Sequence, residues 1–132
     1  MKRSKLTQSL EDYLEVIHVL LQTNKIARIR DIAAALTVKM PSVARAVAEL
    51  KKQGLVSQEP YSGVELTEEG ERVACAILNR HLLLRKFLKH LGVSESVAAS
   101  DACNMEHILS AETIARIESY MKSVKNSKEA KK

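Results

Sequence analysis

The sequence has few aromatic residues, few cysteines and no long apolar run. Aromatic residues make up 3% of the chain and tryptophan is absent, which argues against the stacking platforms that bind single-stranded nucleic acid. Two cysteines are too few for a disulfide framework. No apolar run reaches the roughly 18 residues of a membrane span, and acidic residues follow the basic start where a signal peptide needs an apolar stretch. We therefore expect a cytoplasmic protein with no membrane partner.

The chain nevertheless has the composition of a folded protein. Its 132 residues are 45% hydrophobic and 28% charged, which is typical of globular domains. This length gives room for one domain, or for one small domain with an appendage, and dimerisation can add stability.

The charges are segregated along the chain. Residues 25–52 carry a net charge of +5 and residues 122–132 a net charge of +4, whereas residues 9–22 carry −3 and residues 95–118 carry −4. A basic block suits a polyanion such as DNA. Acidic blocks that fold together repel each other unless a cation lies between them. Taken singly, each charge is also compatible with a solvated surface.

Apolar periodicity and capping residues predict a mainly α fold with a small β-hairpin. The expected helices cover residues 7–23, 30–36, 40–53, 68–90, 94 to about 107 or 109, and 110 to about 123. Thr67 is the expected cap of the helix over 68–90, and Ser110 is the expected cap of the last helix. Two short extended runs, 55–57 and 64–66, flank a turn that contains Pro, Ser and Gly. A hairpin directly after a helix-turn-helix pair is a winged helix. We therefore predict a winged helix-turn-helix DNA-binding domain over 1–70, a helical domain over 71–123 and a basic, disordered tail over 124–132.

The second helix of such a pair lies in the major groove, with its N-terminal residues toward the base edges. Ser42 and Arg45 share one face of this predicted helix, away from the apolar Val43 and Val47. Arg45 can donate to a guanine edge or to a phosphate. For each residue alone, surface solubility is the plainer explanation. The predicted DNA-binding residues are Arg28, Lys39, Pro41, Ser42, Arg45, Lys51, Lys52 and Tyr61.

Polar residues also share helix faces at spacings that suit a metal ion. Asp12 and Glu15 are three residues apart, and Cys103, Glu106 and His107 follow an i, i+3, i+4 pattern. Carboxylate, imidazole and a single thiolate suit a divalent first-row metal, and they argue against a structural zinc site. The candidate ligands are Asp12, Glu15, His81, Cys103, Glu106 and His107.

The same residues have simpler interpretations. A single Glu is usually solvated, and Cys103 alone would fit a small buried hydrophobe. We interpret Cys75 as a core residue, because nothing else ligand-like surrounds it, and His18 and His90 as surface or structural residues.

Five segments in order make the chain similar to a known family. They are SLEDYLEVI, ARIRDIAAALTVKMPSVARAVAELKKQGLV, YSGVELTEEG, NRHLLLRKFLKHLGV and DACNMEHILS. Over about residues 7–123 the chain resembles the DtxR/MntR family of metal-dependent transcriptional repressors. The resemblance implies a homodimer in which metal joins the winged helix to a helical metal-binding and dimerisation domain, and it places all six candidate ligands on family ligand positions. It also implies the shorter architecture of the manganese regulators, without a C-terminal β-barrel.

The resemblance departs from the family pattern at three positions. Manganese regulators carry Glu where this chain has Cys103, and iron-type members carry Met where it has Asp12. A thiolate is softer than a carboxylate and shifts preference toward Fe(II), Co(II), Ni(II) or Zn(II). Arg85 stands where iron-type members place a Glu, so their ancillary site is not supported. The implied cofactor is Mn(II) or Fe(II), with one or two ions per subunit, and no organic cofactor is implied.

The function implied by residues and resemblance together is metal-dependent repression. The homodimer would bind double-stranded operator DNA when Mn(II) or Fe(II) is bound, and would control metal-uptake or homeostasis genes. A winged-helix regulator that responds to a non-metal signal is the alternative. The basic block speaks against a metal buffer, and the absence of a nucleophile-base pair and of a glycine-rich phosphate loop speaks against an enzyme.

Overall fold

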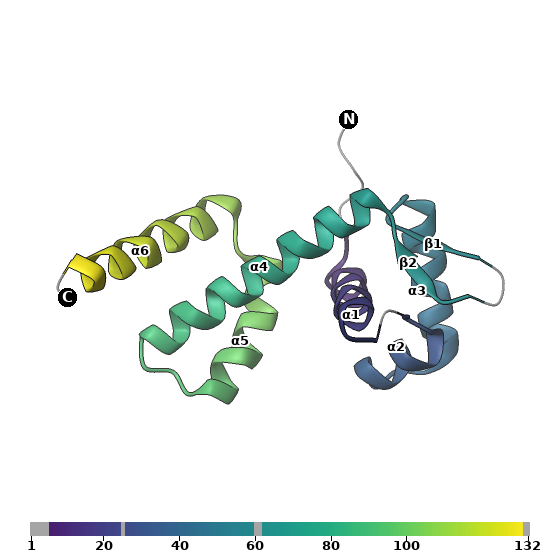
Figure 1. Ribbon diagram of the computed structural model, residues 1–132. Helices are drawn as coiled ribbons and strands as arrows, with labels where there is room; N and C mark the ends of the chain where they lie inside the picture. The colour runs from purple at the N-terminus through teal and green to yellow at the C-terminus, as the bar shows by residue number, and fades with distance from the viewer. Residues whose placement is uncertain (1–5, 25, 60–61, 131–132) are drawn as a thin grey trace. The chain divides into compact units, whose positions relative to one another are not determined.

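A computed structural model describes residues 6–24, 26–59 and 62–130. Over these residues the fold is mainly helical with one antiparallel hairpin, as predicted (Figure 1). The elements are α1 (Gln8–Asn24), α2 (Ile29–Leu36), α3 (Met40–Lys52), β1 (Val56–Gln58), β2 (Val64–Leu66), α4 (Glu68–His90), α5 (Glu95–Ile108) and α6 (Ala111–Ala130). No helix in the described ranges is long and apolar enough to span a membrane.

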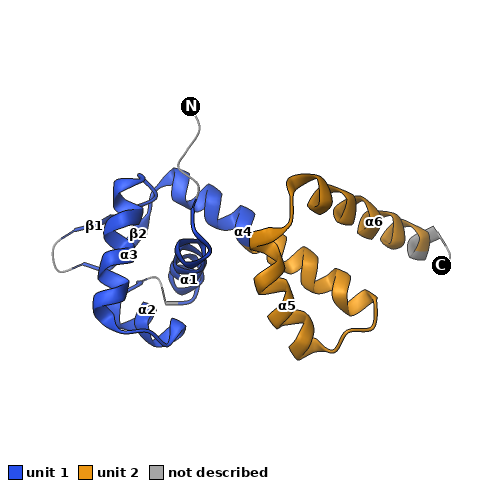
Figure 2. Ribbon diagram, turned by 180° about the vertical axis from the view of Figure 1, so that it is seen from behind, with its two compact units in different colours: residues 1–77 blue, residues 78–132 orange. Residues whose placement is uncertain are grey.

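The chain divides into two compact units, residues 1–77 and 78–132, and the division falls within α4 (Figure 2). In unit 1, helices α1, α2 and α3 contact one another around a shared apolar core. Leu14, Ile32 and Val43 are fully buried and come one from each of these helices. The three helices therefore form one helix-turn-helix core, because each buries an apolar stripe against the other two.

The turn between α2 and α3 is tight. Thr37 adopts a left-handed conformation with φ of 55°. Its N–H donates to the Ala34 carbonyl at 3.3 Å, and the Val38 N–H donates to the Ala33 carbonyl at 3.0 Å. These bonds satisfy carbonyls at the end of α2 and let the chain reverse at once into α3.

The wing follows α3. Strands β1 and β2 pair antiparallel, with Val56 opposite Leu66 and Gln58 opposite Val64. The Val64 N–H also donates to the Ala27 carbonyl at 2.7 Å, in an isolated bridge that the sequence did not predict. This bridge ties the hairpin to the segment before α2.

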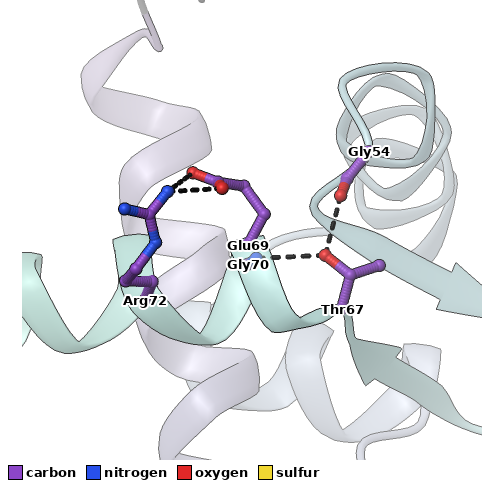
Figure 3. A network of polar contacts seen from close by, with 5 residues as sticks. All are labelled: Gly54, Thr67, Glu69, Gly70 and Arg72. Atoms are coloured by element: carbon purple, nitrogen blue, oxygen red, sulfur yellow. Dashed lines mark hydrogen bonds and ion pairs between the residues drawn. The ribbon is translucent and has the colours of Figure 1, made fainter.

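A polar network fixes the start of α4 (Figure 3). The Thr67 hydroxyl accepts the Gly70 N–H at 3.0 Å and donates to the Gly54 carbonyl at 2.7 Å. Thr67 is therefore the predicted helix cap, and it also joins the end of α3 to the start of α4. A Cβ atom at position 70 would lie 1.8 Å from the Leu55 carbonyl oxygen, so only glycine permits this close approach.

Unit 2 contains the rest of α4 together with α5 and α6. Its core comprises buried Leu84, Leu88, Ala98 and Ala102, with Phe87, Ile114 and Ile117 among the side chains packed against them. The Ser110 hydroxyl accepts the Thr113 N–H at 3.2 Å, which confirms Ser110 as the cap of the last helix.

The last helix is longer than predicted. It continues to Ala130, so residues 124–130 are helical and do not form the expected disordered tail. These residues include lysine, glutamate and alanine, which have high helix propensity, and they contain neither proline nor glycine. Propensity here outweighs the charge repulsion that suggested disorder.

Candidate functional site

The Glu106 carboxylate is the centre of the candidate metal site in unit 2. Its side chain has no exposed surface, although it carries an ionisable group. One oxygen lies 3.5 Å from Nδ1 of His81 on α4, and the other lies 3.3 Å from Nε2 of His107 on α5. A carboxylate is costly to bury unless it is paired or coordinates a metal.

Helix periodicity brings the remaining ligands of unit 2 to this carboxylate. Cys103, Glu106 and His107 share one face of α5, as their spacing predicted, and their donor atoms lie within 4.8 Å of one another. Cys103 is half-buried. The donor set of carboxylate, imidazole and thiolate fits a divalent transition metal.

The other two predicted ligands belong to unit 1. Asp12 and Glu15 are half-buried on α1, three residues apart. Arg85, which stands where iron-type members place a Glu, forms an ion pair with Glu95 in unit 2. Its guanidinium is a cation and cannot ligate a metal, so the ancillary site remains unsupported.

The candidate DNA-binding face is built on α3. Val43, Val47 and Leu50 bury one side of this helix, and Arg45 is exposed on another. Lys39 occupies the N-cap position of α3, and Ser42 is half-buried in the first turn. Five of the predicted DNA-binding residues besides Arg45 are exposed, and these are Arg28, Lys39, Pro41, Lys51 and Lys52. Tyr61 lies outside the described residues.

The structure also shows a group of ligand-type residues that the sequence analysis missed. His18 of α1 lies against Glu71 and Cys75 of α4, all within unit 1. The interpretation of Cys75 as a core residue with no ligand-type neighbour is therefore wrong. Only the i, i+4 spacing of Glu71 and Cys75 was visible in the sequence, because His18 is 57 residues from Cys75.

Two family models match adjacent segments of the chain. Residues 5–64 match the family described as iron dependent repressor, N-terminal DNA binding domain. Residues 67–132 match the family described as iron dependent repressor, metal binding and dimerisation domain. The chain belongs to the DtxR-type iron-dependent repressor family. As a family member it is a metal-dependent transcriptional regulator and not an enzyme, and it has DNA-binding and dimerisation domains.

Individual relatives support the same assignment. The transcriptional regulator MntR of Lysinibacillus sphaericus is 40% identical over 111 residues, which cover 84% of this chain and 80% of that protein. An uncharacterised helix-turn-helix regulator of Methanocaldococcus jannaschii is 36% identical over 123 residues, which cover 92% of this chain and 98% of that protein. A manganese-dependent transcriptional repressor in complex with manganese has a similar structure, with a TM-score of 0.77 and 30% identity over 84% of this chain and 51% of that chain.

Proposed function

We propose that the protein is a repressor that binds operator DNA as a homodimer when Mn(II) or Fe(II) occupies the site around Glu106, and that it controls metal-uptake or homeostasis genes. The observation that carries this proposal is the buried Glu106 carboxylate, with a histidine within 3.5 Å of each oxygen. The experiment below tests whether this site controls DNA binding.

Six residues supply the proposed ligands. Cys103, Glu106 and His107 would hold one ion together with Asp12, and Glu15 with His81 would complete a second. Because the two Glu106 oxygens face different histidines, this carboxylate can serve one or two ions. A bound divalent ion would supply the positive charge that offsets the clustered carboxylates.

The DNA-binding residues then act from α3 and its surroundings. Arg45 and Ser42 would reach base edges or phosphates in the major groove, and the exposed cations Arg28, Lys51 and Lys52 would contact phosphates. In a homodimer, two copies of α3 about 34 Å apart would match the half-sites of a palindromic operator.

Exposed apolar side chains of unit 2 support dimerisation there. Ile108 is 75% exposed and Leu91 is 60% exposed. Leu91 also lines an open, mostly apolar pocket of unit 2 with Phe87, Ile117 and Tyr120, and a contiguous exposed apolar patch is typical of a surface that a partner covers. We expect the second copy to cover at least Leu91.

Fluorescence anisotropy tests the proposal. The labelled duplex is selected from fragments of the source genome that the protein retains with Mn(II). Binding is then measured under anaerobic conditions with chelator, Mn(II), Fe(II), Co(II) and Zn(II). We expect operator binding only with metal, and loss of this response in Glu106→Gln. Glu118→Gln, which removes an exposed carboxylate of α6, is the matched control. Equal binding with chelator would refute the metal switch and favour a regulator of a non-metal signal.

A further inference from the structure

A second cluster of metal-ligating side chains lies wholly within the DNA-binding unit. His18 is on α1, and Glu71 and Cys75 are one turn apart on the first part of α4. One ligand atom from each of the three residues lies within 4.8 Å of the other two. None of the three is among the six candidate ligands of the site around Glu106.

The distances in this cluster are close to those between ligands of a tetrahedral metal, and slightly longer at the sulfur. The His18 Nδ1 atom is 3.3 Å from Glu71 Oε1. The Cys75 sulfur is 3.7 Å from the same oxygen and 3.9 Å from His18 Nε2. Ordinary zinc bond lengths at a tetrahedral angle separate two ligand atoms by about 3.3–3.6 Å. Because an imidazole offers one nitrogen to an ion, His18 would bind through either Nδ1 or Nε2, and only one of its two distances applies. One His18 nitrogen, one Glu71 oxygen and the Cys75 sulfur lie within 4.8 Å of one another, so rotation of the Glu71 or Cys75 side chain would bring all three ligands to one ion.

Burial and charge also favour a cation here. His18 is 2% exposed, so its ring is fixed by packing, whereas Glu71 is exposed and leaves the cluster open to solvent on one side. The first turn of α4 carries Glu68, Glu69 and Glu71. Arg72, the neighbouring cation, forms an ion pair with Glu69. This ion pair of Arg72 is therefore with Glu69 and not with Glu71 of the cluster.

We propose that His18, Glu71 and Cys75 form a further metal site that takes a borderline-soft divalent ion such as Zn(II) or Co(II). Imidazole, carboxylate and thiolate are the ligands that such ions prefer, and a water molecule would complete a four-coordinate site. The ion replaces the thiol proton of Cys75, which is released to solvent. By holding α1 to the start of α4, the bound ion stabilises the DNA-binding unit whether or not the site around Glu106 is filled.

The cysteine content of the chain allows a selective spectroscopic test. Cys75 and Cys103 are the only cysteines, so in full-length Cys103→Ser any thiolate-to-Co(II) charge-transfer band must come from Cys75. We expect this band when Co(II) is added anaerobically to Cys103→Ser. We expect it to be absent from the double variant Cys75→Ser/Cys103→Ser.

Two further variants in the Cys103→Ser background test the other ligands. The loss of a residue that only orients a metal ligand typically weakens affinity by about 10–100-fold. Losing a ligand in Glu71→Gln or His18→Gln should therefore raise the Kd measured from the band by at least about 100-fold. Glu68→Gln removes an exposed carboxylate from the same helix turn and should leave the Kd unchanged. Far-UV circular dichroism checks the fold of every variant. If His18→Gln unfolds, the exposed Glu71 still provides the test.

Two results would overturn the proposal. One is a folded Cys103→Ser protein that shows no charge-transfer band with Co(II). The other is a band whose Kd is the same in Glu71→Gln and in Glu68→Gln, which would mean that Cys75 binds the ion without this cluster. Operator binding is not a readout here, so failure of the regulatory proposal would leave this result interpretable.

Discussion

Replacing Gly70 with alanine should destabilise the protein, although alanine is the better helix former. By propensity alone, a Gly→Ala change inside a helix gains about 1 kcal/mol. Here the added Cβ would lie 1.8 Å from the Leu55 carbonyl oxygen, and that oxygen accepts the Thr67 N–H at 3.0 Å. Forcing an extra carbon into packed surroundings costs about 1–3 kcal/mol. If the carbonyl moves away, a backbone donor is left unsatisfied at about 1–3 kcal/mol.

We therefore expect Gly70→Ala to lower the free energy of unfolding by about 3 kcal/mol, a large share of the roughly 5–15 kcal/mol of a typical domain. Urea unfolding of the full chain, followed by circular dichroism with chelator at a fixed protein concentration, measures the change. Gly54→Ala is the control, because no atom beyond its two chain neighbours lies within 4 Å of the added Cβ and only its φ of +76° is unfavourable. That control should lose about 1–2 kcal/mol. A Gly70→Ala protein as stable as wild type would show that α4 does not begin against Leu55.

Three other substitutions separate the roles of the described residues. Arg45→Ala should weaken operator binding by about tenfold or more in anisotropy, since it removes a base or phosphate contact, and isothermal titration should find metal affinity unchanged; a large loss of metal affinity would contradict the assignment. Cys103→Glu should shift the order of metal affinities toward Mn(II), because a carboxylate is harder than a thiolate. Competition between Mn(II) and Co(II) for the protein measures this order, and an unchanged order would contradict the role of Cys103 in metal preference. Thr67→Val should cost about 1–2 kcal/mol of unfolding free energy through loss of the helix cap, whereas Thr67→Ser should retain most of it.

Local signals in the sequence predicted most of the fold. Thr67 and Ser110 both cap the helices expected to follow them, because a cap depends only on a hydroxyl and the next three residues. The Ala27–Val64 bridge was not predicted, since it joins residues far apart in the sequence without a periodic pattern. The end of α6 was also misplaced, because a lysine-rich segment can be helical or disordered at similar composition.

In the candidate metal site, too, local spacing was predictable from the sequence and tertiary contacts were not. The grouping of Cys103, Glu106 and His107 follows from helical spacing alone, and the structure places their donor atoms together. That Glu106 would be completely buried was not visible, because burial depends on tertiary packing. His18 was interpreted as surface or structural for the same reason. Its two neighbours, Glu71 and Cys75, come from another helix, and no local sequence pattern predicts a contact between residues so far apart in the chain.

The left-handed Thr37 makes stability and recognition separable in the helix-turn-helix. A β-branched residue with φ of 55° is rare and costs about 1–2 kcal/mol relative to glycine. The angle between α2 and α3 is thus maintained by packing against the local preference of the chain. Thr37 is not among the predicted DNA-binding residues, so we expect relief of this strain to raise the melting temperature and to leave operator affinity unchanged. The turn therefore offers a position at which heat resistance can be gained while every DNA-contacting side chain stays as it is.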